Sequence, residues 1–199
     1  MDTNTSEIKS EDASESGKRI FVEKKKSGLQ IRDILLIGIL LASGAVLKFF
    51  VGSVINFGMK PNFIIAMYCL TILLIRPRLL EAAIIGLLAG AVCQFFPGQP
   101  YINIISELAG AVAMCLLARI PFEKIKIPVK PIICAFFSTL VSGFTFIGIM
   151  YLLYFTRTNV LISAPTPLAI FMAIIFGTAT INAIIVQLLY IPLRLALKK

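Results

Sequence analysis

Apolar runs long enough to cross a lipid bilayer recur along this chain from Ile34 onward, with short polar or Pro/Gly-containing segments between them. An α-helix rises about 1.5 Å per residue, so about 20 apolar residues cross about 30 Å of hydrocarbon. The pattern predicts helices at about residues 34–53, 61–75, 79–96, 101–118, 131–155 and 168–193. We therefore expect an all-α, polytopic membrane protein with six transmembrane helices.

The first 30 residues have a different pattern, because Ser, Thr, Asp and Glu dominate residues 1–17 and Lys and Arg dominate residues 18–32. No apolar run in this segment predicts a buried helix, and the first such run is too long and comes too late for a cleavable signal peptide. We expect a disordered cytoplasmic tail with a basic collar over residues 1–30 and a six-helix transmembrane domain over residues 31–199.

Composition agrees with a membrane protein, since 58% of the residues are hydrophobic. The formal net charge is +9, and basic residues are retained on the cytoplasmic side of membrane crossings. With the N-terminus inside, the predicted inner segments hold most of the Lys and Arg residues, whereas the outer loops hold Lys60 and Arg157. We expect a multi-pass protein of the cell membrane with both termini cytoplasmic. Its charge is explained by topology and by attraction to anionic lipid, without nucleic acid.

Several function classes lack their usual residues in this sequence. There is no histidine, no G-x-S-x-G or H-E-x-x-H motif, and no phosphate-binding G-x-x-x-x-G-K-[ST] loop. The four cysteines show no C-x-x-C spacing and fall within predicted helices, where packing is their expected role. We predict that the chain is not an enzyme, that it needs no metal or cofactor, and that any ATP is used by another chain.

Polar groups inside the predicted helices are the candidate functional residues, because ionisable side chains in a membrane are costly. Glu107 and Asn103 share one face of the fourth run. Glu107 is either protonated or bonded to a neighbouring helix, or it is a carboxylate that faces a polar cavity. Ser142 and Thr145 on the fifth run and Asn182 on the sixth are either interhelical bonding groups or ligand contacts. Lys48, near the end of the first run, is expected to reach the lipid headgroups.

Two predicted outer loops carry complementary groups. The stretch NFGMKPNF places Phe57, Lys60 and Asn62 after the first helix, and QFFPGQPYIN places aromatic residues and Gln99 above the Glu107 face. One interpretation is a tight turn with an ordinary belt of interfacial aromatics, in which Lys60 anchors the loop. The other is a site at which a lysine, a carboxylate and aromatic rings recognise an aromatic amino-acid zwitterion.

The stretches FGMKPN (residues 57–62), FPGQPYINIISE (96–107) and VSGFTFIG (141–148) resemble those of the TrpP-type tryptophan transporter family. The resemblance extends from about Leu35 to about Pro192. It implies a small six-helix protein similar to the substrate-binding S components of energy-coupling factor transporters. Such components capture a nutrient outside and depend on a separate transmembrane coupling subunit and on ATPases for its release inside.

We therefore predict a tryptophan importer. Lys60 is expected to bind the substrate carboxylate, Glu107 and Asn103 its ammonium group, and four aromatic residues its indole ring. The alternatives are an S component for another small nutrient such as a vitamin, or a membrane scaffold that transports nothing. The predicted substrate-binding residues are Phe57, Lys60, Asn62, Phe95, Phe96, Gln99, Tyr101, Asn103, Glu107, Ser142, Thr145 and Asn182.

Overall fold

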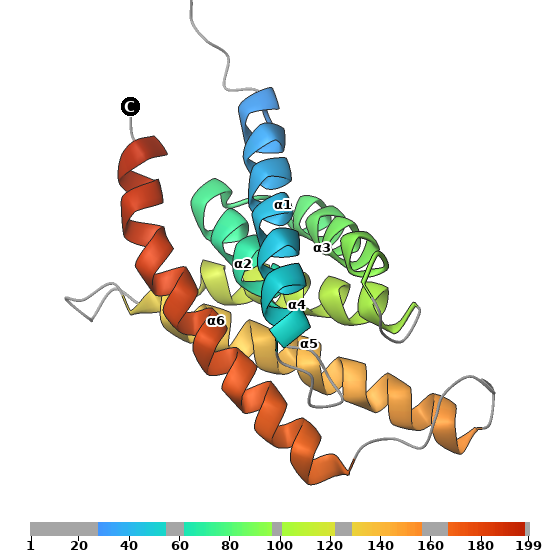
Figure 1. The fold of residues 1–199 in the computed structure, drawn as a ribbon. Coiled ribbons are helices and arrows are strands. Elements are labelled where there is room, and N and C mark those ends of the chain that lie inside the picture. The colour runs from blue at the N-terminus through green and yellow to red at the C-terminus, as the bar shows by residue number, and fades with distance from the viewer. Residues whose placement is uncertain (1–27, 55–61, 97–100, 122–128, 157–166, 198–199) are drawn as a thin grey trace, which may run out of the picture.

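The computed structural model describes residues 28–54, 62–96, 101–121, 129–156 and 167–197, and all regular structure in these ranges is α-helical. Six helices follow one another (Figure 1), which confirms the all-α prediction. Their ends lie within about one helical turn of the predicted ends. Residues 1–27 of the predicted tail, which was expected over residues 1–30, lie outside the described residues, and so do Phe57 and Lys60. The helices are α1 (Ile31–Val54), α2 (Ile64–Ile75), α3 (Leu79–Cys93), α4 (Ile102–Arg119), α5 (Lys130–Phe155) and α6 (Leu168–Leu197).

Four of the six helices, α1, α4, α5 and α6, are long and apolar enough to cross a membrane. The other two are shorter, with 12 residues in α2 and 15 in α3. At about 1.5 Å per residue they reach about 18 and 22 Å, less than the hydrocarbon thickness of about 30 Å. The structure therefore has the six predicted helices, and four of them meet the length expected of a transmembrane helix.

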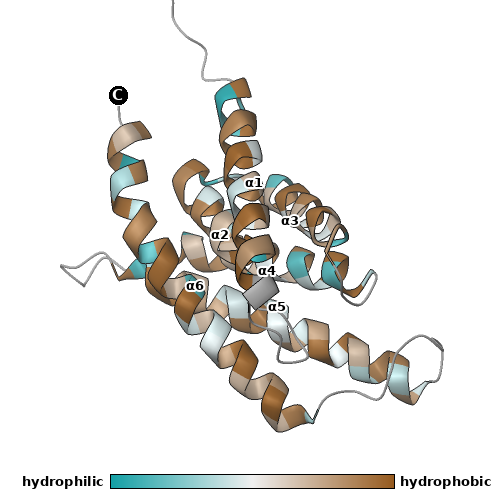
Figure 2. Cartoon of the chain, in the orientation of Figure 1, coloured by the Kyte–Doolittle hydropathy of each residue, from teal (hydrophilic) through white to brown (hydrophobic). Residues whose placement is uncertain are grey.

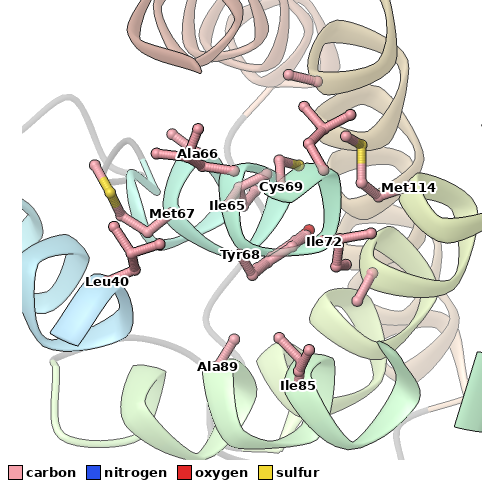
Figure 3. Close-up of a cluster of buried hydrophobic side chains, with 14 of the residues drawn as sticks. Leu40, Ile65, Ala66, Met67, Tyr68, Cys69, Ile72, Ile85, Ala89 and Met114 are labelled. Atoms are coloured by element: carbon pink, nitrogen blue, oxygen red, sulfur yellow. The ribbon is translucent and has the colours of Figure 1, made fainter. Parts of the chain in front are cut away.

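The short helix α2 occupies the centre of the bundle, and the other five helices all pack against it. Every residue from Ile64 to Leu73 is buried. Figure 3 shows Leu40 of α1, Ile85 and Ala89 of α3 and Met114 of α4 around the α2 side chains. A helix that is apolar on all sides is stable where every side is covered, so α2 forms the core of the bundle.

Glycines allow α3 and α4 to pack closely. Gly86 and Gly90 are four residues apart on one face of α3, the spacing of a small-xxx-small motif. A Cβ at Gly86 would lie 2.7 Å from the Ala111 Cβ and 2.8 Å from the Glu107 carbonyl oxygen. A Cβ at Gly90 would lie 2.6 Å from the Ile104 Cα. This contact fixes α4, and with it the backbone of Glu107, against α3.

Apolar side chains cover the outside of the bundle as well as its core. Large apolar side chains such as Leu35, Phe50 and Leu188 are exposed on the outside of the bundle. Hydrophobic residues make up much of every helix (Figure 2). Buried polar side chains lie inside it, namely Lys48, Thr71, Ser106, Glu107, Ser138, Thr139, Ser142, Thr178 and Asn182. This arrangement suits a protein surrounded by lipid, in which polar groups find partners within the protein.

The start of α1 and the end of α6 lie at the same end of the bundle (Figure 1). The Arg32 guanidinium group donates a hydrogen bond to the Leu197 carbonyl oxygen, with an N–O distance of 3.3 Å. The ends of the helical domain are therefore held on one side, as an even number of membrane crossings requires.

Candidate functional site

Glu107 lies on the buried face of α4, where Gly110, Ala111 and Met114 follow it at helical spacing. Its side chain is 1% exposed. Among the described residues the other two carboxylates, Asp33 and Glu81, lie in the first turns of α1 and α3, where a negative charge is favourable. Glu107 is thus the one described carboxylate within the body of a helix, where only specific partners can stabilise it.

Two neutral donors reach the Glu107 carboxylate from other elements. The Asn62 side-chain amide donates to Oε1, and the Ser142 hydroxyl on α5 donates to Oε2 with an O–O distance of 3.4 Å. Asn62 is itself held in place, because its Oδ1 accepts a bond from the Ile64 N–H at 3.3 Å. Its backbone carbonyl accepts a bond from the Asn182 amide of α6 at 3.1 Å. These contacts point the Asn62 amide at the carboxylate.

A buried cation lies beside this cluster. Lys48 on α1 is 7% exposed, and its ammonium group donates to the Cys93 sulfur at 3.2 Å. The ammonium nitrogen also lies 5.3 Å from the centre of the Phe96 ring, within the range of a cation–π contact. Cys93 connects the two charges, since the Asn62 amide nitrogen is 3.6 Å from the same sulfur.

Further bonds tie α2, α5 and α6 to the cluster. The Asn182 amide donates to the Thr139 hydroxyl at 3.4 Å. The Ser138 hydroxyl donates to the Gly110 carbonyl at 2.9 Å and accepts from the Cys69 thiol at 3.3 Å. Each of the six helices therefore contributes a polar group, directly or through Asn62 just before α2.

Two buried atoms in this region have no hydrogen-bond partner among the described residues, the Tyr68 hydroxyl and the Asn182 Oδ1. Tyr68 is fully buried on α2, and its oxygen would lie 2.3 Å from a Cβ added at Gly110. Buried polar atoms are normally paired, and an unpaired one often marks a place for a ligand or water. The Tyr68 hydroxyl and the Asn182 Oδ1 are thus the unpaired buried polar atoms of this region in the described part of the chain.

Of the residues predicted from the sequence, the structure brings together Asn62, Glu107, Ser142 and Asn182, with Phe96 against Lys48. The remaining described candidates lie elsewhere. Phe95 and Tyr101 are 87% and 73% exposed, and Thr145 donates to the Val141 carbonyl of its own helix. Asn103 is half-buried, with its carbonyl accepting a bond from the Ser106 hydroxyl. Phe57, Lys60 and Gln99 lie outside the described residues.

Three residues of this region, Lys48, Tyr68 and Cys93, were not among the substrate-binding residues predicted from the sequence. We expected Lys48 to reach the headgroups, and this was wrong because its ammonium group turns inward to Cys93. The sequence did contain a signal for Lys48, because a lysine within an apolar run is a candidate for a functional residue. Tyr68 and Cys93 carried no comparable signal, because both residue types are also common in ordinary cores.

The four cysteines are all free and buried, and they include the two that contact polar groups, Cys69 and Cys93. Within the described ranges no group of three His, Cys, Asp or Glu side chains is placed to hold a metal ion. The described cluster therefore contains one carboxylate, one ammonium group, and neutral hydroxyl, amide and thiol groups around them.

An apolar exterior, helices of membrane-spanning length and inward-facing charges define an α-helical membrane protein with a buried polar site. Sites of this kind are typical of proteins that move small polar molecules through a membrane. The family model of the tryptophan transporter TrpP matches residues 30–198, and the chain belongs to this family. It is thus a member of a transporter family and not of an enzyme family.

One similar protein is described as a probable tryptophan transport protein of Clostridium acetobutylicum. The two are 27% identical over 175 residues, which cover 85% of this chain and 96% of the relative. No solved structure matches the chain.

Proposed function

We propose that this protein imports tryptophan and that the Glu107 cluster is part of its substrate site. The observation that carries the proposal is a buried carboxylate held by neutral donors inside an apolar bundle, in a chain that belongs to the tryptophan transporter family. The name of the clostridial relative points to the same substrate. A free amino acid brings an ammonium group, which is a stronger partner for a carboxylate than an amide or a hydroxyl.

The site assignment follows from what each residue offers. Glu107 is the acceptor for the substrate ammonium group, and Asn62 and Ser142 orient its two oxygens. Asn182 and Tyr68 supply the unpaired acceptor and donor. Phe96, half-buried beside Lys48, is available to the indole ring, since aromatic rings pack favourably against one another.

We further propose that the protein crosses the membrane six times with both termini in the cytoplasm, α2 and α3 being short crossings shielded by their neighbours. The basic residues support this orientation. Arg32, Arg76, Arg119, Lys130 and Arg194 each lie at the start of an odd-numbered helix or at the end of an even-numbered one. In a bundle that alternates direction these positions share one side, which the positive-inside rule makes cytoplasmic.

Energy for accumulation is proposed to come from partners, as in S components. Transport against a gradient needs an energy source, and the sequence contains no phosphate-binding loop of the G-x-x-x-x-G-K-[ST] type. In this proposal a separate transmembrane coupling subunit and ATPases act on the substrate-loaded protein.

Uptake of labelled tryptophan tests the transport proposal in cells that lack other tryptophan importers. We expect uptake with the wild-type chain, and at low substrate a loss of roughly tenfold or more for Glu107→Gln, which removes a charged hydrogen-bond acceptor. Glu81→Gln is the matched control, because Glu81 accepts a bond from the Arg78 N–H at the start of α3, away from the cluster. Equal uptake with and without the chain would refute the transport proposal.

Protein levels in the membrane must be measured for each variant. If Glu107→Gln is inserted normally and transports like the wild type, Glu107 is a structural residue and the site assignment is wrong. If Glu81→Gln is as impaired as Glu107→Gln at equal protein level, the loss does not report on the cluster.

A further inference from the structure

The described part of the site contains two opposite charges with weak partners. The Lys48 ammonium group has three hydrogens to donate, and its described partners are a thiol and the face of an aromatic ring. A thiol is a weak acceptor. The Glu107 carboxylate likewise receives an amide and a hydroxyl, both neutral. Buried charges are normally compensated by an opposite charge, and here the direct hydrogen-bond partners of both charges among the described residues are neutral.

The neutral groups between the two charges form a short connected path. Lys48 contacts Cys93, Cys93 contacts the Asn62 amide, and the Asn62 amide donates to Glu107. Both charged side chains thus border the same pair of groups, one from α1 and the other from α4. A ligand that displaces Cys93 and Asn62 from these contacts would meet a cation on one side and an anion on the other.

A free amino acid is a ligand with this charge pattern, because its ammonium and carboxylate groups are attached to the same carbon atom. We infer that Lys48 and Glu107 bind the head group of a zwitterionic amino acid, Lys48 its carboxylate and Glu107 its ammonium group. The inference rests on the proposed function and assigns to Lys48 the role that the sequence analysis gave to Lys60. Charged hydrogen bonds on both sides would replace weaker contacts with neutral groups.

Two analogues separate the two halves of the head group. Tryptamine keeps the ammonium group and lacks the carboxylate, whereas indole-3-propionate keeps the carboxylate and lacks the ammonium group. The protein contains no tryptophan, so indole fluorescence excited beyond the tyrosine band reports the ligand alone. Binding of all three compounds to the purified full chain in detergent can therefore be measured directly.

We expect the wild type to bind tryptophan at least about tenfold more tightly than either analogue. Lys48→Met should weaken tryptophan binding by roughly ten- to hundredfold, the loss of a charged hydrogen bond, and should leave tryptamine binding unchanged. Glu107→Gln should weaken tryptophan binding similarly and leave indole-3-propionate binding unchanged. Lys48→Arg should recover part of the affinity, because the charge is kept and the geometry differs.

Two lysine variants serve as comparisons. Lys130→Met removes a lysine at the start of α5, whose ammonium group donates to the Ile120 carbonyl, and should bind all three compounds like the wild type. Lys60→Met tests the earlier assignment. If it causes the carboxylate-specific loss and Lys48→Met does not, Lys60 binds the carboxylate and the inference is overturned.

Other outcomes also overturn the inference. If Lys48→Met weakens the binding of tryptophan and of tryptamine equally, Lys48 affects binding indirectly, by stabilising the fold. If the variant does not insert, the analogue series on the wild type still decides, since equal binding of tryptophan and tryptamine excludes a carboxylate contact. If cells take up tryptophan but the purified protein binds it no more tightly than the two analogues, the inference fails and the transport proposal stands. If the wild type neither binds nor transports tryptophan, both fail.

Discussion

Gly110 is the position at which the smallest change should disturb the site most. A methyl group there would place its carbon 2.3 Å from the Tyr68 hydroxyl oxygen and 2.9 Å from the Ser142 Cβ. Both distances are below those that real side chains adopt, and both neighbours are buried. The ring of Tyr68 is packed within the core (Figure 3). Gly110→Ala therefore requires α4 to move away from α2 or α5.

The expected cost follows from two contributions. Inserting a methyl group into a well-packed core destabilises a protein by about 1–3 kcal/mol. A shift of α4 would also strain the bond from the Ser138 hydroxyl to the Gly110 carbonyl, and an interhelical bond of this kind contributes about 0.6 kcal/mol in a membrane. For a chain of this size, about 1 kcal/mol corresponds to about 2–4 °C in the unfolding midpoint. Together the two contributions are about 1.6–3.6 kcal/mol, so we expect a decrease of roughly 3–14 °C.

The assay is thermal unfolding of the purified protein in detergent, followed by helical circular dichroism. The control is Gly148→Ala on α5, because a Cβ at Gly148 has no neighbour within 4 Å. Gly148→Ala should unfold at or slightly above the wild-type temperature, since alanine favours the helix. Tryptophan affinity should fall in Gly110→Ala and persist in the control. Equal midpoints for the two variants would refute the packing described around Tyr68.

Two further predictions concern topology and energy coupling. A cysteine introduced at Gly98 should react with a membrane-impermeant thiol reagent added to intact cells, whereas one at Lys126 should react only after lysis, because the positive-inside rule predicts that residue 126 is cytoplasmic. The reverse pattern would mean that the protein has the opposite orientation. If partners supply the energy, purification from native membranes should yield the chain together with an ATPase pair. If the chain is purified alone, and its uptake collapses with a protonophore while ATP is maintained, an ion gradient supplies the energy instead.

The six helices could be predicted from the sequence because apolar runs are interrupted by residues that end helices. Arg76 and Pro77 separate α2 from α3, and the structure places Arg76 in the left-handed region with a φ of 52°. The central position of α2 could not be predicted. A fully apolar helix looks the same whether lipid or protein surrounds it, and the ten consecutive buried residues of α2 are a property of the packing.

Part of the site followed from one physical rule, that polar side chains in a membrane helix turn toward the protein interior. The rule identified Glu107, Ser142 and Asn182 as candidates, and the structure brings them together although they are far apart in sequence. It failed for Lys48, because a lysine near a helix end has two low-cost environments, the headgroups and the interior, and sequence does not distinguish them. The exposure of Phe95 and Tyr101 depends on loop geometry, which local residue types did not reveal.

Asn62 connects three helices at the candidate site. Its Oδ1 accepts a bond at the start of α2, its amide donates to Glu107 of α4, and its carbonyl accepts a bond from Asn182 of α6. A ligand ammonium group that binds Glu107 competes with the Asn62 amide, and any displacement of Asn62 changes contacts at three helices together. A ligand can shift an arrangement of helices only through such differential contacts. Asn62→Ala should therefore keep the Glu107 side chain in place and weaken the response of the bundle to tryptophan, which ligand-induced thermal stabilisation measures. If tryptophan stabilises Asn62→Ala as much as the wild type, binding at Glu107 does not act through Asn62.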